Sequence, residues 1–249
     1  MEREIRQLAE IIYGERGSNL VVIAARPFMG KTMLSIRLTH HFIMEEKATA
    51  FFSMKLPSNR LMRYLLFINT NIELEKIKQG SLSDMEQSKI NKASSNLSRL
   101  PLSIYDGSTF SVETIKEKAF ELKNTTGLDL LFIDYLQLLT SSVKCNSRQE
   151  EITIILSELK AIAEELAVSI IVLSQLSRSV EEKHDKRPEV NDLYEIGQVE
   201  PNADKIIFLY SDAYYSSKPS EASSTEIIIA KDNNGKPGKI IIDEFINYS

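Results

Sequence analysis

The sequence Ala25-Arg-Pro-Phe-Met-Gly-Lys-Thr32 follows an apolar run, residues 19–24, and opens a helical stretch, residues 33–45. A buried strand, a loop and a helix in this order bring backbone N–H groups and the positive end of a helix dipole to one point. Gly30 lets the backbone approach an anion, Lys31 is placed to reach β- and γ-phosphates, and the Thr32 hydroxyl is a ligand for Mg²⁺. The stretch therefore predicts a P-loop that binds a nucleoside triphosphate.

The expected phosphate-binding set covers most of this loop. The generic motif has a glycine where this chain has Ala25, so the match contains one departure. We expect the nucleotide to contact the loop and the first turn of the helix after it, at Ala25, Arg26, Pro27, Met29, Gly30, Lys31, Thr32 and Met33.

Composition bounds the class of protein. A chain of 249 residues with 43% hydrophobic residues can bury one substantial core, and no Pro/Gly/Ser-rich linker divides it. We expect a single domain over residues 1–249, with an N-terminal helix and turn over 2–18 and a P-loop core over 19–249. The net charge of −5 disfavours a general polyanion binder, so contact with DNA would be local.

The cysteine content and the apolar runs of the sequence bear on its cellular compartment and on membrane contact. Cys145 is the single cysteine, which excludes a disulfide framework and indicates a reducing compartment, the cytoplasm. The N-terminus has no apolar signal region, and no later apolar run reaches the ~18 residues of a membrane span. The sequence predicts a soluble protein without membrane contact.

Strand and helix patterns alternate along the chain. Apolar runs predict strands at 20–24, 48–53, 102–105, 128–134, 168–173 and 205–210, and a hairpin of 225–230 with 239–242. Helical periodicity and caps predict helices at 2–13, from Pro57, at 83–99, 111–124 and 149–167, and short helices within 176–204. This order predicts an α/β fold: a doubly wound, mostly parallel sheet with helices on both faces, a C-terminal β-hairpin, and its site at the carboxyl edge.

Two polar residues end predicted strands. Asp134 closes the run 128–134, where its carboxylate would be the second Mg²⁺ partner beside Thr32; the alternative is a helix cap or a surface turn. Gln175 ends the run that follows, where it would donate to the γ-phosphate; the alternative is a polar strand terminus.

Five segments together resemble a known family. They are ARPFMGKT at 25–32, FIDYLQLL at 132–139, LSQLSRSVE at 173–181, DKRP at 185–188 and ADKIIFLY at 203–210. In order and spacing they are similar to the ATPase domain of DnaB-type hexameric replicative DNA helicases, from about residue 5 to 246. That family also has alanine at the position of Ala25. The resemblance implies a RecA-like P-loop NTPase fold, ATP and Mg²⁺ as cofactors, a hexameric ring, and single-stranded DNA at its centre.

The chain departs from the family where hydrolysis would occur. The resemblance implies a glutamate that activates the attacking water where this chain has Lys55, and an arginine finger from the neighbouring subunit where it has Asn233. Lys231, the nucleotide-contacting lysine of the same segment, is retained. A missing general base costs ~10²–10⁴-fold in rate, and a missing finger ~10³–10⁵-fold. Another carboxylate, Glu45 or Glu46, or a partner subunit remains an alternative source of these groups.

The DNA-facing loop departs as well. The family's Asp-Leu-Arg-Glu-Ser-Gly reads Asp192-Leu-Tyr-Glu-Ile-Gly197, so an aromatic that stacks on bases replaces a cation. The resemblance implies contacts with DNA at Tyr194, Glu195, Gly197 and Arg178.

Two functions follow from these positions. The first is a DNA-replication protein that binds ATP and Mg²⁺, keeps Lys31 and Gln175 as catalytic residues but is impaired in hydrolysis, and is an accessory partner of a replicative helicase or another replication protein. The alternative is an active ATP-dependent helicase or translocase, a ring on single-stranded DNA. A recombinase or clock-type ATPase shares the core, but FIDYLQLL and LSQLSR favour the helicase branch. If this sequence is the whole protein, the family's N-terminal domain and linker helix are missing and a homo-hexamer standing alone is less expected; if it is part of a longer chain, that expectation does not apply.

Overall fold

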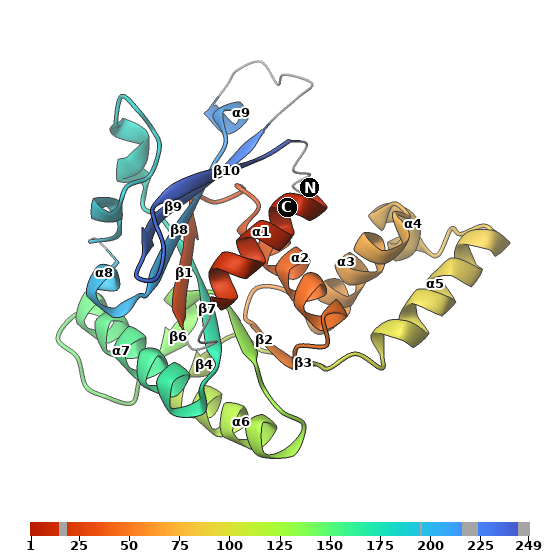
Figure 1. Ribbon diagram of the computed structural model, residues 1–249, viewed down its shortest axis with the longest axis horizontal. Helices are drawn as coiled ribbons and strands as arrows, with labels where there is room; N and C mark the ends of the chain where they lie inside the picture. Colours follow the sequence, from red (N-terminus) through yellow and green to blue (C-terminus); the bar gives the residue numbers. More distant parts are fainter. Residues whose placement is uncertain (15–18, 195, 216–223, 244–249) are drawn as a thin grey trace.

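An eight-stranded sheet forms the centre of the computed structural model, which describes residues 1–14, 19–194, 196–215 and 224–243 (Figure 1). The strand order is β10-β9-β8-β1-β7-β5-β2-β3. Its strands are β1 (Leu20–Ala25), β2 (Thr49–Ser53), β3 (Leu102–Asp106), β5 (Leu130–Asp134), β7 (Ser169–Gln175), β8 (Lys205–Tyr210), β9 (Thr225–Asp232) and β10 (Gly238–Ile242). Two short strands, β4 (Phe110–Ser111) and β6 (Leu139–Thr140), pair separately.

Six of these strands, from β3 to β8 in the spatial order, run parallel, and β9 and β10 are antiparallel additions at one edge. Parallel strands need crossover connections, and helices supply them. The helices are α1 (Glu2–Tyr13), α2 (Lys31–Met44), α3 (Ser58–Thr70), α4 (Leu74–Gln79), α5 (Asp84–Leu97), α6 (Val112–Thr125), α7 (Arg148–Leu166), α8 (Val199–Asn202) and α9 (Asp212–Tyr215), with 3₁₀ turns η1 (Leu136–Leu138), η2 (Arg178–Glu182) and η3 (Val190–Leu193).

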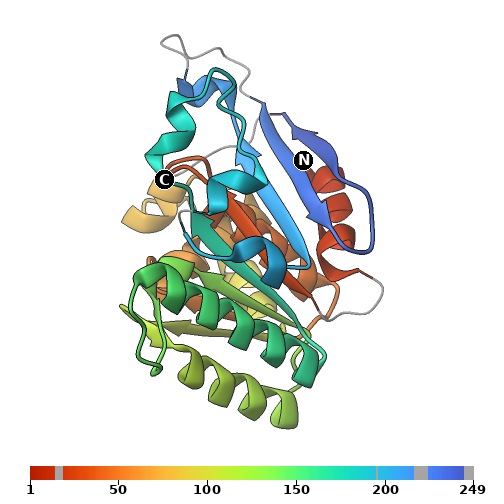
Figure 2. The ribbon, with the colours of Figure 1, turned by 90° about the vertical axis from the view of Figure 1, so that its left-hand side faces the viewer.

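The sheet has a separate hydrophobic core on each face. Alternate residues of β1 divide between them: Val21 and Ile23 pack with α1, α2 and α3, whereas Leu20 and Val22 pack with α6 and α7. Such strands are buried on both faces, which explains their uninterrupted apolar sequence. Figure 2 shows α6 and α7 together on one side of the sheet, and α1 beside the β9–β10 hairpin. The doubly wound fold with helices on both faces and a C-terminal hairpin is confirmed.

Local capping signals also hold. Ser83 and Glu86 form the capping box that begins α5, and the Ser111 hydroxyl accepts from the Thr114 backbone N–H at the start of α6. Helix α4 is not in the sequence prediction. It has six residues and buries none of them, so no apolar period marks it. With α5 it extends away from the sheet (Figure 1).

Strand register brings the predicted site residues to one edge. Ala25 pairs with Gln175 between β1 and β7, and Ser53 pairs with Asp134 between β2 and β5. The carboxyl ends of parallel strands meet at the same edge, so the loop after Ala25 lies beside the tips of its neighbours. The sheet thereby places the P-loop, Asp134 and Gln175 around one crevice.

Candidate nucleotide-binding site

The P-loop joins β1 to α2 through a turn that needs left-handed backbone. Gly30 is the N-cap of α2 with φ 82°, and Phe28 has φ 63°. A glycine adopts this region at no steric cost, whereas for a large side chain it is a departure that occurs mainly at functional loops. The first N–H groups of α2 have no partner within the helix and face the loop. Helix N-termini of this kind can bind anions.

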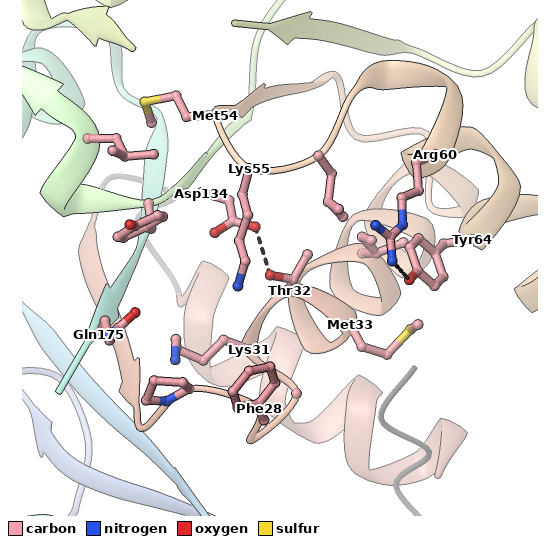
Figure 3. Close-up of a pocket in the computed structure, with 16 residues that line it drawn as sticks. Phe28, Lys31, Thr32, Met33, Met54, Lys55, Arg60, Tyr64, Asp134 and Gln175 are labelled. Atoms are coloured by element: carbon pink, nitrogen blue, oxygen red, sulfur yellow. Dashed lines mark hydrogen bonds between the residues drawn. The ribbon is translucent and has the colours of Figure 1, made fainter. Parts of the chain in front are cut away.

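A pocket of about 490 Å³ opens at this helix end (Figure 3). It is bounded by the P-loop, the first turn of α2, the turn between β2 and α3, and the tips of β5 and β7. Eight residues of the sequence prediction line it: Pro27, Gly30, Lys31, Thr32, Met33, Lys55, Asp134 and Gln175. The volume lies within the usual range of small-molecule pockets.

Thr32 and Asp134 form an oxygen pair at the base of the pocket. The Thr32 hydroxyl donates to Asp134 Oδ2 at 2.8 Å, and Asp134 is buried, with 2% of its surface exposed. Burial raises the pKa of the Asp134 carboxyl, whereas the Thr32 hydrogen bond and the charges of Lys55 and Lys31 oppose the rise. A hydroxyl and a carboxylate are the hard ligands that Mg²⁺ prefers, so this donor set fits the metal implied by the family.

Lys31 bends back over its own loop. Its ammonium donates to the carbonyl oxygens of Ala25 at 2.8 Å and Arg26 at 3.0 Å. Burial, and secondly the nearby charge of Lys55, lower the pKa of Lys31 to about 7. An anion in the pocket would favour the charged form of Lys31 and so oppose both effects.

Two loop residues point away from the pocket. The buried Arg26 side chain donates from Nε to Glu181 Oε1 at 2.8 Å and from Nη1 to the Leu176 carbonyl at 2.6 Å. Met29 is buried in the core on the α2 face. Only the backbone of these two residues is available to a phosphate, and the Arg26 side chain instead anchors the loop to η2.

Lys55 is presented by a tight turn between β2 and α3. The Ser53 hydroxyl donates to the Leu56 carbonyl at 2.6 Å, and the Met54 N–H donates to the Asp134 carbonyl at 2.9 Å. These bonds hold the turn against the tip of β5. The Lys55 side chain therefore enters the pocket, and its ammonium points toward Lys31 beside the Thr32–Asp134 hydrogen bond (Figure 3).

Glu45 and Glu46 do not substitute for a carboxylate at position 55. Both follow the C-terminal end of α2, which has 14 residues. At the helical rise this puts them about 20 Å from the P-loop end. Among the described residues that line the pocket, Asp134 is the one carboxylate.

Gln175 is held in place by a residue that sequence reasoning missed. The Gln137 side-chain amide donates to the Ser174 hydroxyl and to the Gln175 carbonyl, both at 3.0 Å, and its oxygen accepts from the Gln175 N–H at 3.3 Å. Gln137 therefore clamps the tip of β7 to η1. Its polar place in the apolar FIDYLQLL segment is the signal that could have indicated this role.

Eight further lining residues were missed, among them Phe28, Arg60 and Tyr64. Phe28 lies at the pocket mouth, and Arg60 and Tyr64 reach the pocket from α3. Arg60 Nη2 donates to the Tyr64 hydroxyl at 3.4 Å, as the i, i+4 spacing on one helix face permits. Phe28 belongs to the P-loop segment, whereas no local motif marks Arg60 and Tyr64, which the docking of α3 places.

Lys231 and Asn233 lie at the opposite edge of the sheet. β9 is antiparallel to β8, and its end, Asp232, pairs with the first residue of β8, Lys205. The Lys231 ammonium donates to the carbonyls of Glu200 at 2.7 Å and Ala203 at 2.8 Å, and Asn233 Nδ2 donates to Asp204 Oδ1 at 3.3 Å. Neither residue lines the pocket of its own chain.

The predicted DNA-contact residues also lie outside the pocket. Tyr194 follows η3 with 57% of its surface exposed, and Arg178 is exposed at the start of η2. Glu195 lies outside the described residues. Gly197 has φ 150° and packs against α7, where an added Cβ would stand 3.0 Å from the Gln149 carbonyl oxygen.

Gly197→Ala is expected to destabilise the chain by about 1–3 kcal/mol, because the new methyl group adds strained backbone to a clash with α7. Chemical denaturation measures the change. Gly80→Ala is the matched control, since Gly80 also has positive φ, 69°, but its added Cβ meets nothing within 4 Å. Equal losses in the two variants would show that the α7 contact contributes nothing.

The sheet order, the P-loop that opens α2 and the buried strand-tip carboxylate beside it define a P-loop NTPase of the RecA-like class. The family model of the DnaB-like helicase C-terminal domain matches residues 1–247, and the chain belongs to this family. Membership supports a role in DNA replication.

Curated relatives are replicative helicases. The chain is 36% identical over 236 residues to "Replicative DNA helicase DnaC" of Bacillus subtilis, covering 94% of this chain and 52% of that protein. It is 39% identical over 218 residues to "Probable plasmid replicative DNA helicase" of Chlamydia psittaci, covering 87% and 47%. The chain thus spans about half the length of these relatives.

Solved structures agree with this assignment. One of them, described as an ATPase domain, superposes with a TM-score of 0.88 at 34% identity, covering 96% of this chain and 85% of that one. A DnaB-like replicative helicase, whose structure was described with its interactions with primase, superposes with a TM-score of 0.87 at 34% identity, covering 95% and 57%. Within the described part of the chain, no helix has the length and apolar character needed to cross a bilayer.

Proposed function

We propose that this chain is a DNA-replication protein that binds ATP and Mg²⁺ at its P-loop, hydrolyses ATP poorly, and is an accessory or regulatory partner of a replicative helicase. One observation carries the proposal. Lys55 enters the pocket beside Asp134 and Lys31, at the position where the family resemblance implies a water-activating glutamate.

Four pocket side chains, together with backbone N–H groups, are proposed to hold the nucleotide and its metal. The loop and α2 N–H groups bind the phosphates, and Lys31 leaves the Ala25 and Arg26 carbonyls to contact the β- and γ-phosphates. Thr32 and Asp134 would hold Mg²⁺, which neutralises phosphate charge when bound. Gln175, whose backbone Gln137 holds, would donate to the γ-phosphate. Residues 1–249 are proposed to form one domain.

Poor hydrolysis follows from the absence of a free base among the described pocket residues. An ammonium group cannot accept the proton of an attacking water, and Asp134 is engaged by the Thr32 hydroxyl. Losing the general base costs ~10²–10⁴-fold in rate. A domain that binds ATP but does not turn it over keeps the ATP-bound conformation, which suits a regulatory subunit.

The partner is proposed to be a replicative helicase or another replication protein. The argument is the position of two residues that the family resemblance assigns to the interface between subunits. Lys231 and Asn233 lie away from the chain's own pocket, at an edge of the sheet that can meet a second subunit. Tyr194, Glu195, Gly197 and Arg178 are the proposed contacts with single-stranded DNA. The loss of the family's arginine at Tyr194 weakens that contact, because a stacking ring neutralises no phosphate.

The second candidate is an active helicase or translocase, a homo-oligomeric ring on single-stranded DNA. Lys31, Thr32, Asp134 and Gln175 all line one pocket, as an active ATPase needs. In this case a partner subunit supplies the missing base and finger.

The deciding experiment compares ATP bound with ATP hydrolysed by the purified chain, with and without single-stranded DNA. We expect stoichiometric binding with little turnover, and a Kd about 10–100-fold weaker in Lys31→Ala, since a charged hydrogen-bond donor is lost. Lys89→Ala, at an exposed site on α5, is the control. Turnover that DNA stimulates and Lys31→Ala abolishes would instead establish the active motor.

A further inference from the structure

The pocket is more positive than a phosphate site that depends on a metal ion for its positive charge. Its lining holds three cationic side chains, Lys31, Lys55 and Arg60, and among the described lining residues a single carboxylate, Asp134. A lysine in place of a carboxylate makes a site more positive by two charges, which is the charge of one Mg²⁺ ion. The pocket without the metal is therefore as positive as a glutamate-bearing pocket with the metal.

Lys55 is also in the right part of the pocket for this substitution. Its ammonium lies near enough to Asp134 and to Lys31 to act on both, and Figure 3 shows it beside the hydrogen bond between Thr32 and Asp134. These two residues are the oxygen ligands proposed for Mg²⁺. The cation thus lies beside the two residues that would hold the metal.

The chemistry of the two cations favours the lysine here. An ammonium group is a compact charge with three donors on a flexible stem, so it can follow the phosphate oxygens. Mg²⁺ gives up its water reluctantly and requires octahedral coordination, and a neighbouring ammonium repels it. The Lys55 side chain is exposed and also lines the pocket, so water and a bound phosphate can both reach it.

We infer that the Lys55 ammonium takes over the charge-neutralising role of the metal, so that this pocket holds a nucleoside triphosphate with little dependence on Mg²⁺. The inference rests on the proposed function, because it concerns the same P-loop site. It adds that the chain senses the triphosphate itself rather than the metal complex. Thr32 and Asp134 still fit a metal, but binding does not require it.

The test is calorimetric titration of ATP into the chain in excess Mg²⁺ and in excess EDTA. The variants are Lys55→Met, which keeps the stem and removes the charge, and Lys55→Arg, which keeps the charge. Lys89→Met removes one charge from the surface of α5 and is the matched control. We expect EDTA to weaken binding by less than about threefold in the unchanged chain, Lys55→Arg and Lys89→Met, and by about tenfold or more in Lys55→Met.

Equal EDTA factors in the unchanged chain and Lys55→Met would overturn the inference. If ATP binds in Mg²⁺ but EDTA abolishes binding in every variant, the inference fails while the proposed function stands. If ATP binds under neither condition, the proposed nucleotide site fails and the inference falls with it. Intrinsic tyrosine fluorescence during urea unfolding verifies that Lys55→Met is folded.

Discussion

Lys55→Glu combined with Asn233→Arg is expected to raise the rate of ATP hydrolysis at least about a hundredfold over the unchanged chain. The glutamate would stand in the pocket beside the Thr32–Asp134 pair, with an acceptor for the proton of the attacking water. The arginine would supply the charge that stabilises the transferring phosphoryl group. Steady-state release of phosphate with and without single-stranded DNA measures the gain.

Controls separate the two substitutions from changes in net charge. Lys55→Gln removes the ammonium without adding a base, so it should leave the rate nearly unchanged. Because Asn233 does not line its own pocket, Asn233→Arg can act only on a second subunit. A mixture of Lys55→Glu chains with Asn233→Arg chains should therefore hydrolyse ATP faster than either alone. A folded double variant with an unchanged rate would refute the hydrolysis-impaired assignment.

The fold was predictable because its signals are local. The four residues of β5 before Asp134 are all apolar because both faces of the strand are covered, and the Ser83–Glu86 capping box forms as its spacing predicts. Such patterns depend only on neighbours along the chain. The P-loop, Asp134 and Gln175 met at one crevice because parallel strands share a carboxyl edge, so topology alone sufficed to bring them together.

The rest of the pocket depends on tertiary placement. Arg26 belongs to the phosphate-binding motif, yet its side chain pairs with Glu181, 155 residues away, and no pattern in the loop announces that partner. Arg60 and Tyr64 line the pocket because α3 docks beside α2. Lys31 hydrogen-bonds two carbonyl oxygens of its own loop, and the P-loop motif does not predict these contacts.

Lys205→Met is expected to lower the free energy of unfolding by about 3–5 kcal/mol, because it leaves a buried carboxylate without its counter-ion. Lys205 Nζ lies 2.5 Å from Asp232 Oδ1, and the two side chains are 2% and 9% exposed. Asp232 Oδ1 also accepts from the Asn234 N–H at 3.1 Å, so the pair shapes the turn that carries Asn233. Urea denaturation measures the loss.

The double variant Lys205→Met, Asp232→Leu distinguishes an unpaired charge from lost packing. Apolar side chains of similar volume often replace a buried ion pair at little cost, so the second substitution should restore most of the stability that the first removes. The exposed pair of Lys118 and Glu121 on α6 is the comparison, and Lys118→Met should leave the unfolding midpoint unchanged. A Lys205→Met chain as stable as the unchanged one would mean that Asp232 finds water or another donor. The double variant would then show no recovery, because the buried pair would contribute nothing to holding β8 against β9.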